Sequence, residues 1–293
     1  MPATQGPERT MTGPGRLFCF GLGYTGRALA RALEAEGWRV AGTSREAAGT
    51  GLHAFDRARP LDEAGLAALR TATHVLSTVP ADGDGDPVLA ACGELLARSR
   101  AVWIGYLSTT NVYGDLAGGW VDERSPPAPA GERGRRRLAT ETAWRQLHAE
   151  HGRPVHVFRL TGIYGPGRNQ LEALRQGRAR RIDKPGQVFS RIHLDDIVAV
   201  LRASMARPHP GRVYNLADDR PAAPAEVVAY ASILLGVEPP PLEDFETAEM
   251  SAMARSFYDD NKRVANARIK AELGVRLRYP SYREGLAALL EAG

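Results

Sequence analysis

Apolar runs and amphipathic stretches alternate along the first 160 residues of the chain. Short apolar runs are typical of buried parallel strands, and apolar residues spaced three or four apart predict helices that cover a sheet. The predicted strands are residues 16–20, 38–43, 52–55, 74–79, 101–107 and 155–160. The helices predicted between them are residues 24–36, 61–70, 87–98 and 133–151. This order indicates an α/β protein with a doubly wound parallel sheet.

The pattern becomes mixed after residue 167. Helices are predicted near residues 170–177, 195–206, 224–235 and 261–273, and strands at 188–194 and 212–216. We therefore expect residues 161–293 to form mainly a small C-terminal substrate-binding lobe, with segments at about 188–217 returning to the sheet. Residues 1–14 are rich in Pro, Gly and Thr and lack the apolar core of a signal peptide, which predicts a disordered leader.

The junction between the first strand and the first helix carries Gly21-x-Gly23-x-x-Gly26, with Tyr24 and Thr25 in the same turn. Gly21 permits a tight turn, Gly23 lets the backbone approach a pyrophosphate, and Gly26 lets the helix pack closely on the strand. The free N–H groups and the helix dipole then favour phosphate binding. Glycines also mark ordinary turns, but a strand before and a helix after this motif favour a dinucleotide-binding Rossmann domain at residues 15–160.

Ligands of open α/β sheets bind at the carboxyl ends of the parallel strands. Four predicted loops lie at these ends: residues 21–26, Val79-Pro80, 108–110 and 161–167. We expect them to converge on one crevice.

Composition excludes several other classes of protein. The chain has a net charge of +4, but basic and acidic residues are interspersed and aromatic residues are few, so we expect no nucleic-acid partner. No apolar run approaches the length of a membrane span. Cys19 and Cys92 lie in a predicted strand and helix, which indicates free thiols in a reducing compartment, the cytoplasm. We expect no metal site.

Basic residues are unevenly divided between the two types. The 38 Lys and Arg residues include only Lys184, Lys262 and Lys270, which leaves 35 arginines. We interpret this skew as base-composition bias and a solvated surface.

The end of the second strand bears on the choice between NAD and NADP. A free ribose is normally held by a carboxylate there, whereas a 2′-phosphate needs arginine and hydroxyl donors. This strand ends in Thr43-Ser44-Arg45, with no carboxylate before Glu46. Arg45 is either one more surface arginine or a phosphate ligand, and its position with Ser44 favours NADP over NAD.

The order of the motifs resembles the extended short-chain dehydrogenase/reductase superfamily, of the nucleotide-sugar epimerase and dehydratase type. Besides the glycine motif, the resemblance rests on Ser108-Thr-Thr-Asn-Val-Tyr-Gly114, Arg159-Leu-Thr-Gly-Ile-Tyr-Gly-Pro-Gly167, Arg191-Ile-His-Leu-Asp-Asp196, and Val213-Tyr-Asn-Leu-Ala217 with a late Gly236. It covers about residues 16–290. More narrowly, the chain is similar to atypical bacterial proteins of this type, described as NAD-dependent epimerase/dehydratase-like.

The resemblance implies roles for several residues. Val79 and Pro80 would pass beside the cofactor ribose, Asp56 would hold the adenine amino group, and the loop that begins at Tyr164 would cover the nicotinamide. Asp56 is equally well explained as a turn residue. His193 is expected to be structural. Relatives often dimerise through the helices predicted at 87–98 and 133–151, so a homodimer is expected.

The resemblance also exposes a departure in the catalytic residues. Members usually carry Tyr-x-x-x-Lys on the long helix, where the tyrosine is the acid/base and the lysine lowers its pKa and holds the nicotinamide ribose. Here Arg133 and Arg137 occupy these two positions. The positive charge survives on one helix face, but a guanidinium cannot shuttle a proton near neutral pH. The usual mechanism therefore cannot run unchanged.

Thr109 matches the family hydroxyl that bonds a substrate carbonyl or alcohol, although it could instead cap local backbone. Tyr113, on the same loop, is the candidate substitute acid, with Arg133 lowering its pKa; it could equally be a packing residue. Glu132 is a weaker candidate.

Further departures bear on the substrate. Thr110-Asn111 replaces the Asp-Glu pair of the dehydratases, and Gly162 and Phe189 stand where nucleotide-sugar enzymes carry Asn and Arg. Sugar dehydration and diphosphate recognition are therefore disfavoured. Arg168 and Arg191 could bind another anion.

The sequence as a whole favours an NADP- or NAD-binding oxidoreductase or epimerase that moves a hydride to or from a small oxygenated substrate, anionic or sugar-derived. The alternative is a catalytically impaired sensor or scaffold that binds the dinucleotide.

Overall fold

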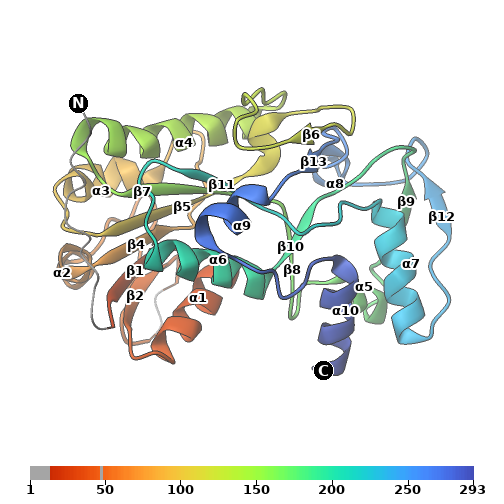
Figure 1. Cartoon of the computed structure of the whole chain (residues 1–293), viewed down its shortest axis with the longest axis horizontal. Helices are drawn as coiled ribbons and strands as arrows, with labels where there is room; N and C mark the ends of the chain where they lie inside the picture. The colour runs from red at the N-terminus through yellow and green to blue at the C-terminus, as the bar shows by residue number, and fades with distance from the viewer. Residues whose placement is uncertain (1–13, 47–48) are drawn as a thin grey trace.

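A seven-stranded parallel sheet forms the core of the larger part of the molecule, to the left in Figure 1. The computed structural model describes residues 14–46 and 49–293. The strand order is β11-β7-β5-β4-β1-β2-β3, and every neighbouring pair is parallel. The strands are β1 (Arg16–Phe20), β2 (Arg39–Ser44), β3 (Leu52–Ala54), β4 (His74–Ser77), β5 (Trp103–Thr109), β7 (Val155–Leu160) and β11 (Val213–Leu216). The predicted doubly wound α/β fold is confirmed.

Helices cover both faces of this sheet. One face packs against α1 (Tyr24–Glu34), α6 (Leu194–Ala206) and α9 (Ala267–Leu273). The other face packs against α2 (Glu63–Thr71), α3 (Pro87–Ala97) and α4 (Glu132–His151). Leu29 and Leu33 of α1 pack with Cys19 of β1 in one core, and Trp144 of α4 packs with Tyr106 of β5 in the other. The sheet is thus buried between two apolar layers, as parallel sheets require.

The second lobe lies at the carboxyl ends of the strands, to the right in Figure 1. Its elements are η1 (Thr110–Tyr113), β6 (Trp120–Val121), β8 (Gly162–Tyr164), α5 (Gln170–Arg175), β9 (Arg181–Asp183), β10 (Arg191–His193), α7 (Pro224–Leu235), β12 (Leu242–Asp244), α8 (Ala252–Ser256), β13 (Arg263–Val264) and α10 (Tyr282–Glu291). Helices α5, α7 and α10 share a small apolar core of their own.

The boundaries of one predicted helix are wrong. The helix expected at 261–273 begins only at Ala267, because Arg263–Val264 pairs as a parallel strand with Trp120–Val121. Two-residue strands of this kind have no detectable periodicity, so the sequence pattern does not predict them.

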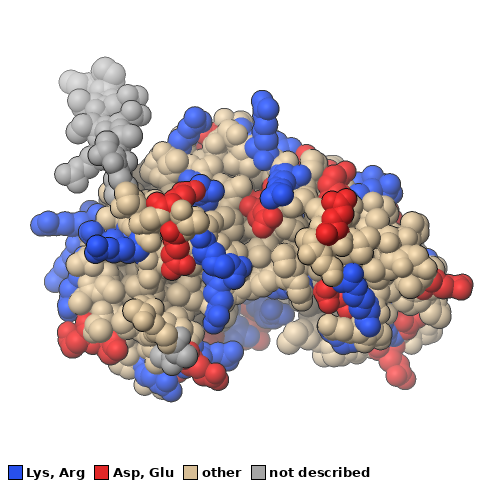
Figure 2. All heavy atoms as spheres, turned by 90° about the horizontal axis from the view of Figure 1, so that it is seen from below, with Lys and Arg blue, Asp and Glu red and all other residues tan. Residues whose placement is uncertain are grey.

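Buried thiols and mixed surface charge match the sequence pattern. Cys19 and Cys92 are both buried and free. Figure 2 shows basic and acidic side chains intermixed over one face of the molecule. Across residues 14–46 and 49–293, no helix is long and apolar enough to cross a bilayer.

Candidate functional site

A cavity of about 900 Å³ opens at the carboxyl ends of the central strands. The start of α1, the end of β5, the β7–β8 segment and the first half of α4 all contribute to its wall. On the opposite side it is lined by residues 188–191 and by the segment around α8. The expected convergence of loops is therefore present, although the loop after β4 reaches the cavity through Thr78 rather than through Val79 or Pro80.

The glycine motif has the geometry that a dinucleotide requires. Gly21 has φ +83°, a left-handed conformation that favours glycine. A Cβ at Gly26 would lie 2.8 Å from the carbonyl oxygen of Gly21, so only glycine lets α1 approach β1 this closely. A Cβ at Gly23 would meet nothing within 4 Å, and Gly23 lines the cavity. This open approach to the start of a helix fits a pyrophosphate group.

Tyr24 and Thr25 also line this end of the cavity. The Tyr24 hydroxyl donates a hydrogen bond to the carbonyl oxygen of Pro166 at 2.9 Å, and the guanidinium of Arg168 lies 5.9 Å from the Tyr24 ring centroid. The loop after β8 is thereby tied to the start of α1, next to the glycine motif.

The residues expected around the adenosine lie outside the cavity wall. The Ser44 hydroxyl donates to the carbonyl of Glu46, and Arg45 is exposed beside it; residues 47 and 48 are not described. The Asp56 carboxylate accepts a hydrogen bond from the Ala58 amide at 2.9 Å, which is the geometry of a turn residue. Val79 lies next to Gly21: a Cβ added at Gly21 would be 3.2 Å from Val79 Cγ2.

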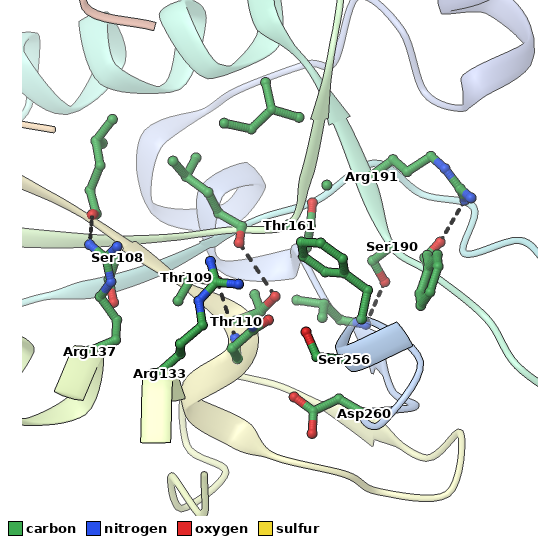
Figure 3. A pocket seen from close by; sticks show the side chains of 18 of the residues that line it. Ser108, Thr109, Thr110, Arg133, Arg137, Thr161, Ser190, Arg191, Ser256 and Asp260 are labelled. Atoms are coloured by element: carbon green, nitrogen blue, oxygen red, sulfur yellow. Dashed lines mark hydrogen bonds between the residues drawn. The ribbon is translucent and has the colours of Figure 1, made fainter. Parts of the chain in front are cut away.

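Arg133 and Arg137 both line the cavity and rise side by side from α4 (Figure 3). Arg137 donates to the Tyr106 hydroxyl at 2.9 Å and to the Leu107 carbonyl at 3.2 Å, which fixes its guanidinium against β5. The Arg133 guanidinium lies 5.9 Å from the ring centroid of Phe257, across the cavity. Two permanent positive charges therefore stand beside the end of β5.

Thr109 stands at the carboxyl end of β5, facing this pair of arginines (Figure 3). It lines the cavity, and its hydroxyl oxygen accepts a long hydrogen bond, 3.3 Å, from the Asn111 amide. The capping role is thus present, and the hydroxyl proton remains available to a ligand because the capping bond uses only an oxygen lone pair.

The expectation that Tyr113 faces the crevice beside Arg133 is wrong. The η1 turn rotates its side chain into a core with Val112 and Val121. Its hydroxyl donates to Asn215 Oδ1 at 2.8 Å, and the Arg159 guanidinium lies 4.7 Å from its ring centroid. Burial raises the pKa of Tyr113, with Arg159 opposing that effect. Tyr113 is therefore a packing residue.

Tyr164 is also placed differently from the expectation. Its ring packs against His193, at 5.1 Å between centroids, and its hydroxyl donates to the Ser281 carbonyl at 3.2 Å. The side chain lines a second, smaller cavity of about 440 Å³ toward α10, and the main cavity is lined instead by Gly162 and Ile163. His193 accepts a hydrogen bond from the Asp195 amide and caps α6, and burial lowers its pKa to about 4.

Arg191 lies between the two cavities. Its guanidinium donates to the carbonyl oxygens of Phe189 at 2.8 Å and Ala222 at 3.1 Å, and burial lowers its pKa. Arg168 lines both cavities as well. Among the described residues, the wall of the main cavity carries five basic side chains and one acidic side chain. The acidic one is Asp260, and the basic ones are Arg133, Arg137, Arg168, Arg191 and Lys262.

The wall opposite α4 was not predicted. It comes from α8 and the segment after it, where Met253, Phe257 and Tyr258 supply apolar surface and Asp260 and Lys262 supply charge. Figure 3 shows Ser256 and Asp260 on this side. The segment has no helical or alternating pattern long enough to identify it. The one available signal in the sequence was the rarity of lysine, since Lys262 is one of only three lysines in the chain.

Comparisons with known proteins show what the chain is similar to. The model of the family described as NAD dependent epimerase/dehydratase matches residues 88–217. Protein YeeZ of Escherichia coli (strain K12) is 32% identical over 278 residues, which cover 89% of this chain and 94% of that protein.

Solved structures are similar over nearly the whole chain. A functionally unknown conserved protein from Silicibacter pomeroyi DSS is 50% identical with a TM-score of 0.85, covering 95% of this chain and 99% of that one. A dTDP-glucose 4,6-dehydratase from Bacillus anthracis str. Ames, in complex with NAD, is 15% identical with a TM-score of 0.77 and covers 94% and 96% of the two chains. At that identity the likeness shows the fold alone.

Proposed function

This chain belongs to the NAD-dependent epimerase/dehydratase family, within the extended short-chain dehydrogenase/reductases, and from that premise we propose that it is a nicotinamide-dependent oxidoreductase or epimerase of a small anionic or sugar-derived substrate. The observation that carries the proposal is the glycine motif. It opens through Gly23 onto the same cavity that Thr109 lines from the other side. One cavity can therefore receive both a dinucleotide and the group it reacts with.

The chain's own residues fit the parts of a dinucleotide. The amides from Gly21 to Gly26 would bind the pyrophosphate, with Tyr24 and Thr25 beside it. Arg137 would bind the nicotinamide ribose, and the Tyr164–Gly167 loop would close over the nicotinamide through its backbone. Val79 and Pro80 would pass beside the adenosine ribose and Asp56 near the adenine. When bound, the nicotinamide supplies or accepts a hydride.

We propose NADP as the preferred cofactor. Ser44 ends β2 and Arg45 follows it, which supplies a hydroxyl and a guanidinium and no carboxylate, a pair suited to a 2′-phosphate. The proposed setting is the cytoplasm, where both thiols stay reduced.

Substrate binding would rest on Thr109 and the basic residues of the cavity wall. The Thr109 hydroxyl would donate to a carbonyl or alcohol oxygen, and Arg133 would stabilise negative charge that develops there. Arg168 and Arg191 would bind an anionic group, which the excess of basic over acidic side chains in the wall supports.

One observation favours a second candidate, a sensor or scaffold that binds the dinucleotide without turnover. The positions of the family tyrosine and lysine carry Arg133 and Arg137, and the nearby tyrosine, Tyr113, faces the core.

The experiment that separates the two follows NADPH and NADH oxidation with a panel of aldehydes, ketones and sugar derivatives. Thr109→Ala should lose activity while it keeps dinucleotide affinity, whereas Thr142→Ala, exposed on α4, should keep both. Dinucleotide binding without turnover would favour the sensor over the enzyme, whereas activity that survives Thr109→Ala would refute the role proposed for Thr109.

We also propose a homodimer through α3 and α4, which lie side by side on one face of the sheet (Figure 1). Light scattering tests this, and a monomeric mass at micromolar concentration would contradict it.

A further inference from the structure

The proposed chemistry moves a proton as well as a hydride, and the arginines of the cavity wall cannot supply it. Four lining side chains can exchange a proton: Tyr24, Tyr258, Asp260 and Lys262. We propose that Lys262, held in place by Asp260 and by the backbone of Gly114, is the catalytic acid/base. This inference rests on the proposed function and gives it the proton donor that Tyr113 cannot be.

The position of Lys262 connects the unpredicted wall of the cavity to the loop that carries Thr109. The lysine precedes β13, and its ammonium donates to the Gly114 carbonyl at 2.9 Å. Gly114 ends the η1 turn that begins immediately after Thr109. The acid and the hydroxyl that would hold the substrate oxygen are therefore fixed to the two ends of one short turn.

The hydrogen bonds of Lys262 leave room for a ligand. An ammonium group has three N–H donors. One bonds the Gly114 carbonyl and a second bonds Asp260 Oδ2 at 3.1 Å. The third has no hydrogen-bond partner among residues 14–46 and 49–293, and Lys262 lines the cavity. It is the donor that a substrate oxygen would meet.

The surroundings of Lys262 favour release of its proton. The side chain is only 7% exposed, and burial lowers the pKa of its ammonium. The acidic groups that face it, Asp260 and Asp115, oppose this effect and stabilise the charged form. An amine whose pKa is lowered by burial and partly raised again by nearby carboxylates can give a proton to an oxygen and accept one from it.

The other three candidates are less suited. The Tyr24 hydroxyl donates a hydrogen bond to the Pro166 carbonyl at the glycine-motif end of the cavity. Burial raises the pKa of Tyr258, whose ring packs edge-on against Phe189. Asp260 accepts the Lys262 hydrogen bond and acts through it, as a positioning residue.

The proton step balances without a further reagent. In the reducing direction, an Nζ–H bond of Lys262 breaks and its proton goes to the carbonyl oxygen, while the carbon takes the hydride that the nicotinamide cofactor supplies. The electron pair stays on Nζ, which is then reprotonated from water. In the oxidising direction, the same lone pair accepts the alcohol proton.

Nuclear magnetic resonance of protein labelled in its lysine side chains tests the acid without any substrate. Three lysine signals are expected, assigned through Lys184→Arg and Lys270→Arg, and the Lys262 signal should titrate below the range of an exposed lysine. A Lys262 signal that titrates in the range of exposed lysine would overturn the proposal.

Kinetics test the role itself. Lys262→Arg keeps the charge and can donate to Gly114 and Asp260, but it cannot release a proton, so kcat should fall about 100- to 10,000-fold with dinucleotide affinity unchanged. The limb of the pH–rate profile that reports the ionisation of Lys262 should disappear.

The matched control is Lys184→Arg, because Lys184 also donates to a backbone carbonyl, that of Tyr258, but lies outside the cavity wall. A Lys262→Arg variant that retains kcat, or a larger loss in Tyr258→Phe, would overturn the assignment. Absence of dinucleotide binding by the unaltered protein would instead refute the proposed function.

Discussion

Gly23→Ala separates ligand binding from stability more cleanly than any other change in the glycine motif. The added Cβ would have no heavy atom within 4 Å, so the folded protein accommodates it without strain. The methyl group would nevertheless stand on the cavity wall, in the space through which a phosphate approaches the amides at the start of α1. We expect most of the stability to be retained and dinucleotide binding to be weakened.

The magnitudes follow from the contacts. Gly23 is the N-cap of α1, where alanine is less favourable than glycine, so the substitution should lower the free energy of unfolding by no more than about 1 kcal/mol. A hydrogen bond to a charged group contributes about 2 kcal/mol, so losing one between backbone and pyrophosphate should raise the Kd roughly 30-fold. Gly26→Ala is the contrasting variant: its Cβ would lie 2.8 Å from a backbone oxygen and 3.0 Å from Cys19 Sγ, and it should destabilise the protein by about 1–3 kcal/mol.

The assay combines urea unfolding with fluorescence titration of NADPH and NADH. Gly93→Ala is the matched control, because its Cβ also meets nothing and it lies on α3, away from the cavity wall. Unchanged affinity in Gly23→Ala, with native stability, would refute the assignment of this turn to the pyrophosphate.

Three further predictions concern selectivity, the buried ion pair and pH. Arg45→Ala should raise the Kd of NADPH about tenfold and leave that of NADH unchanged, as measured by thermal-shift titration with both; equal losses would refute the 2′-phosphate role. Glu141→Gln should lower the free energy of unfolding by about 3–5 kcal/mol in urea, because it leaves the Arg159 guanidinium buried without its carboxylate partner; a change below about 1 kcal/mol would contradict this. Burial lowers the pKa of His156 from 6.5 to about 4, so the unfolded chain binds a proton there that the folded protein does not. Stability should therefore fall as the pH falls from about 6.5 to about 4, by up to about 3 kcal/mol for this residue, and thermal melts of His156→Gln should show a smaller loss.

Local patterns predicted the sheet and the strand–turn–helix of the glycine motif well, for physical reasons. The run from Arg16 through Gly26 contains a strand, a turn and a helix start that depend on residues adjacent in sequence. The carboxyl-end rule then placed Thr109 on the same cavity as Gly23, and helical spacing placed Arg133 and Arg137 on one face.

Side-chain direction outside regular elements could not be predicted in the same way. Tyr113 follows Thr109 by four residues, but the η1 turn decides which of the two faces the cavity. Lys262 reaches the site from a segment 148 residues beyond Gly114, a contact set by tertiary folding alone. Both cases concern a side chain considered for the proton transfer of the proposed chemistry.

Isothermal titration calorimetry with NADP⁺ and NAD⁺ tests the central claim most directly. The account predicts saturable heat at one site per chain, stronger for NADP⁺ and weakened in Gly23→Ala. No heat from either coenzyme at millimolar concentration, with the protein folded, would contradict it.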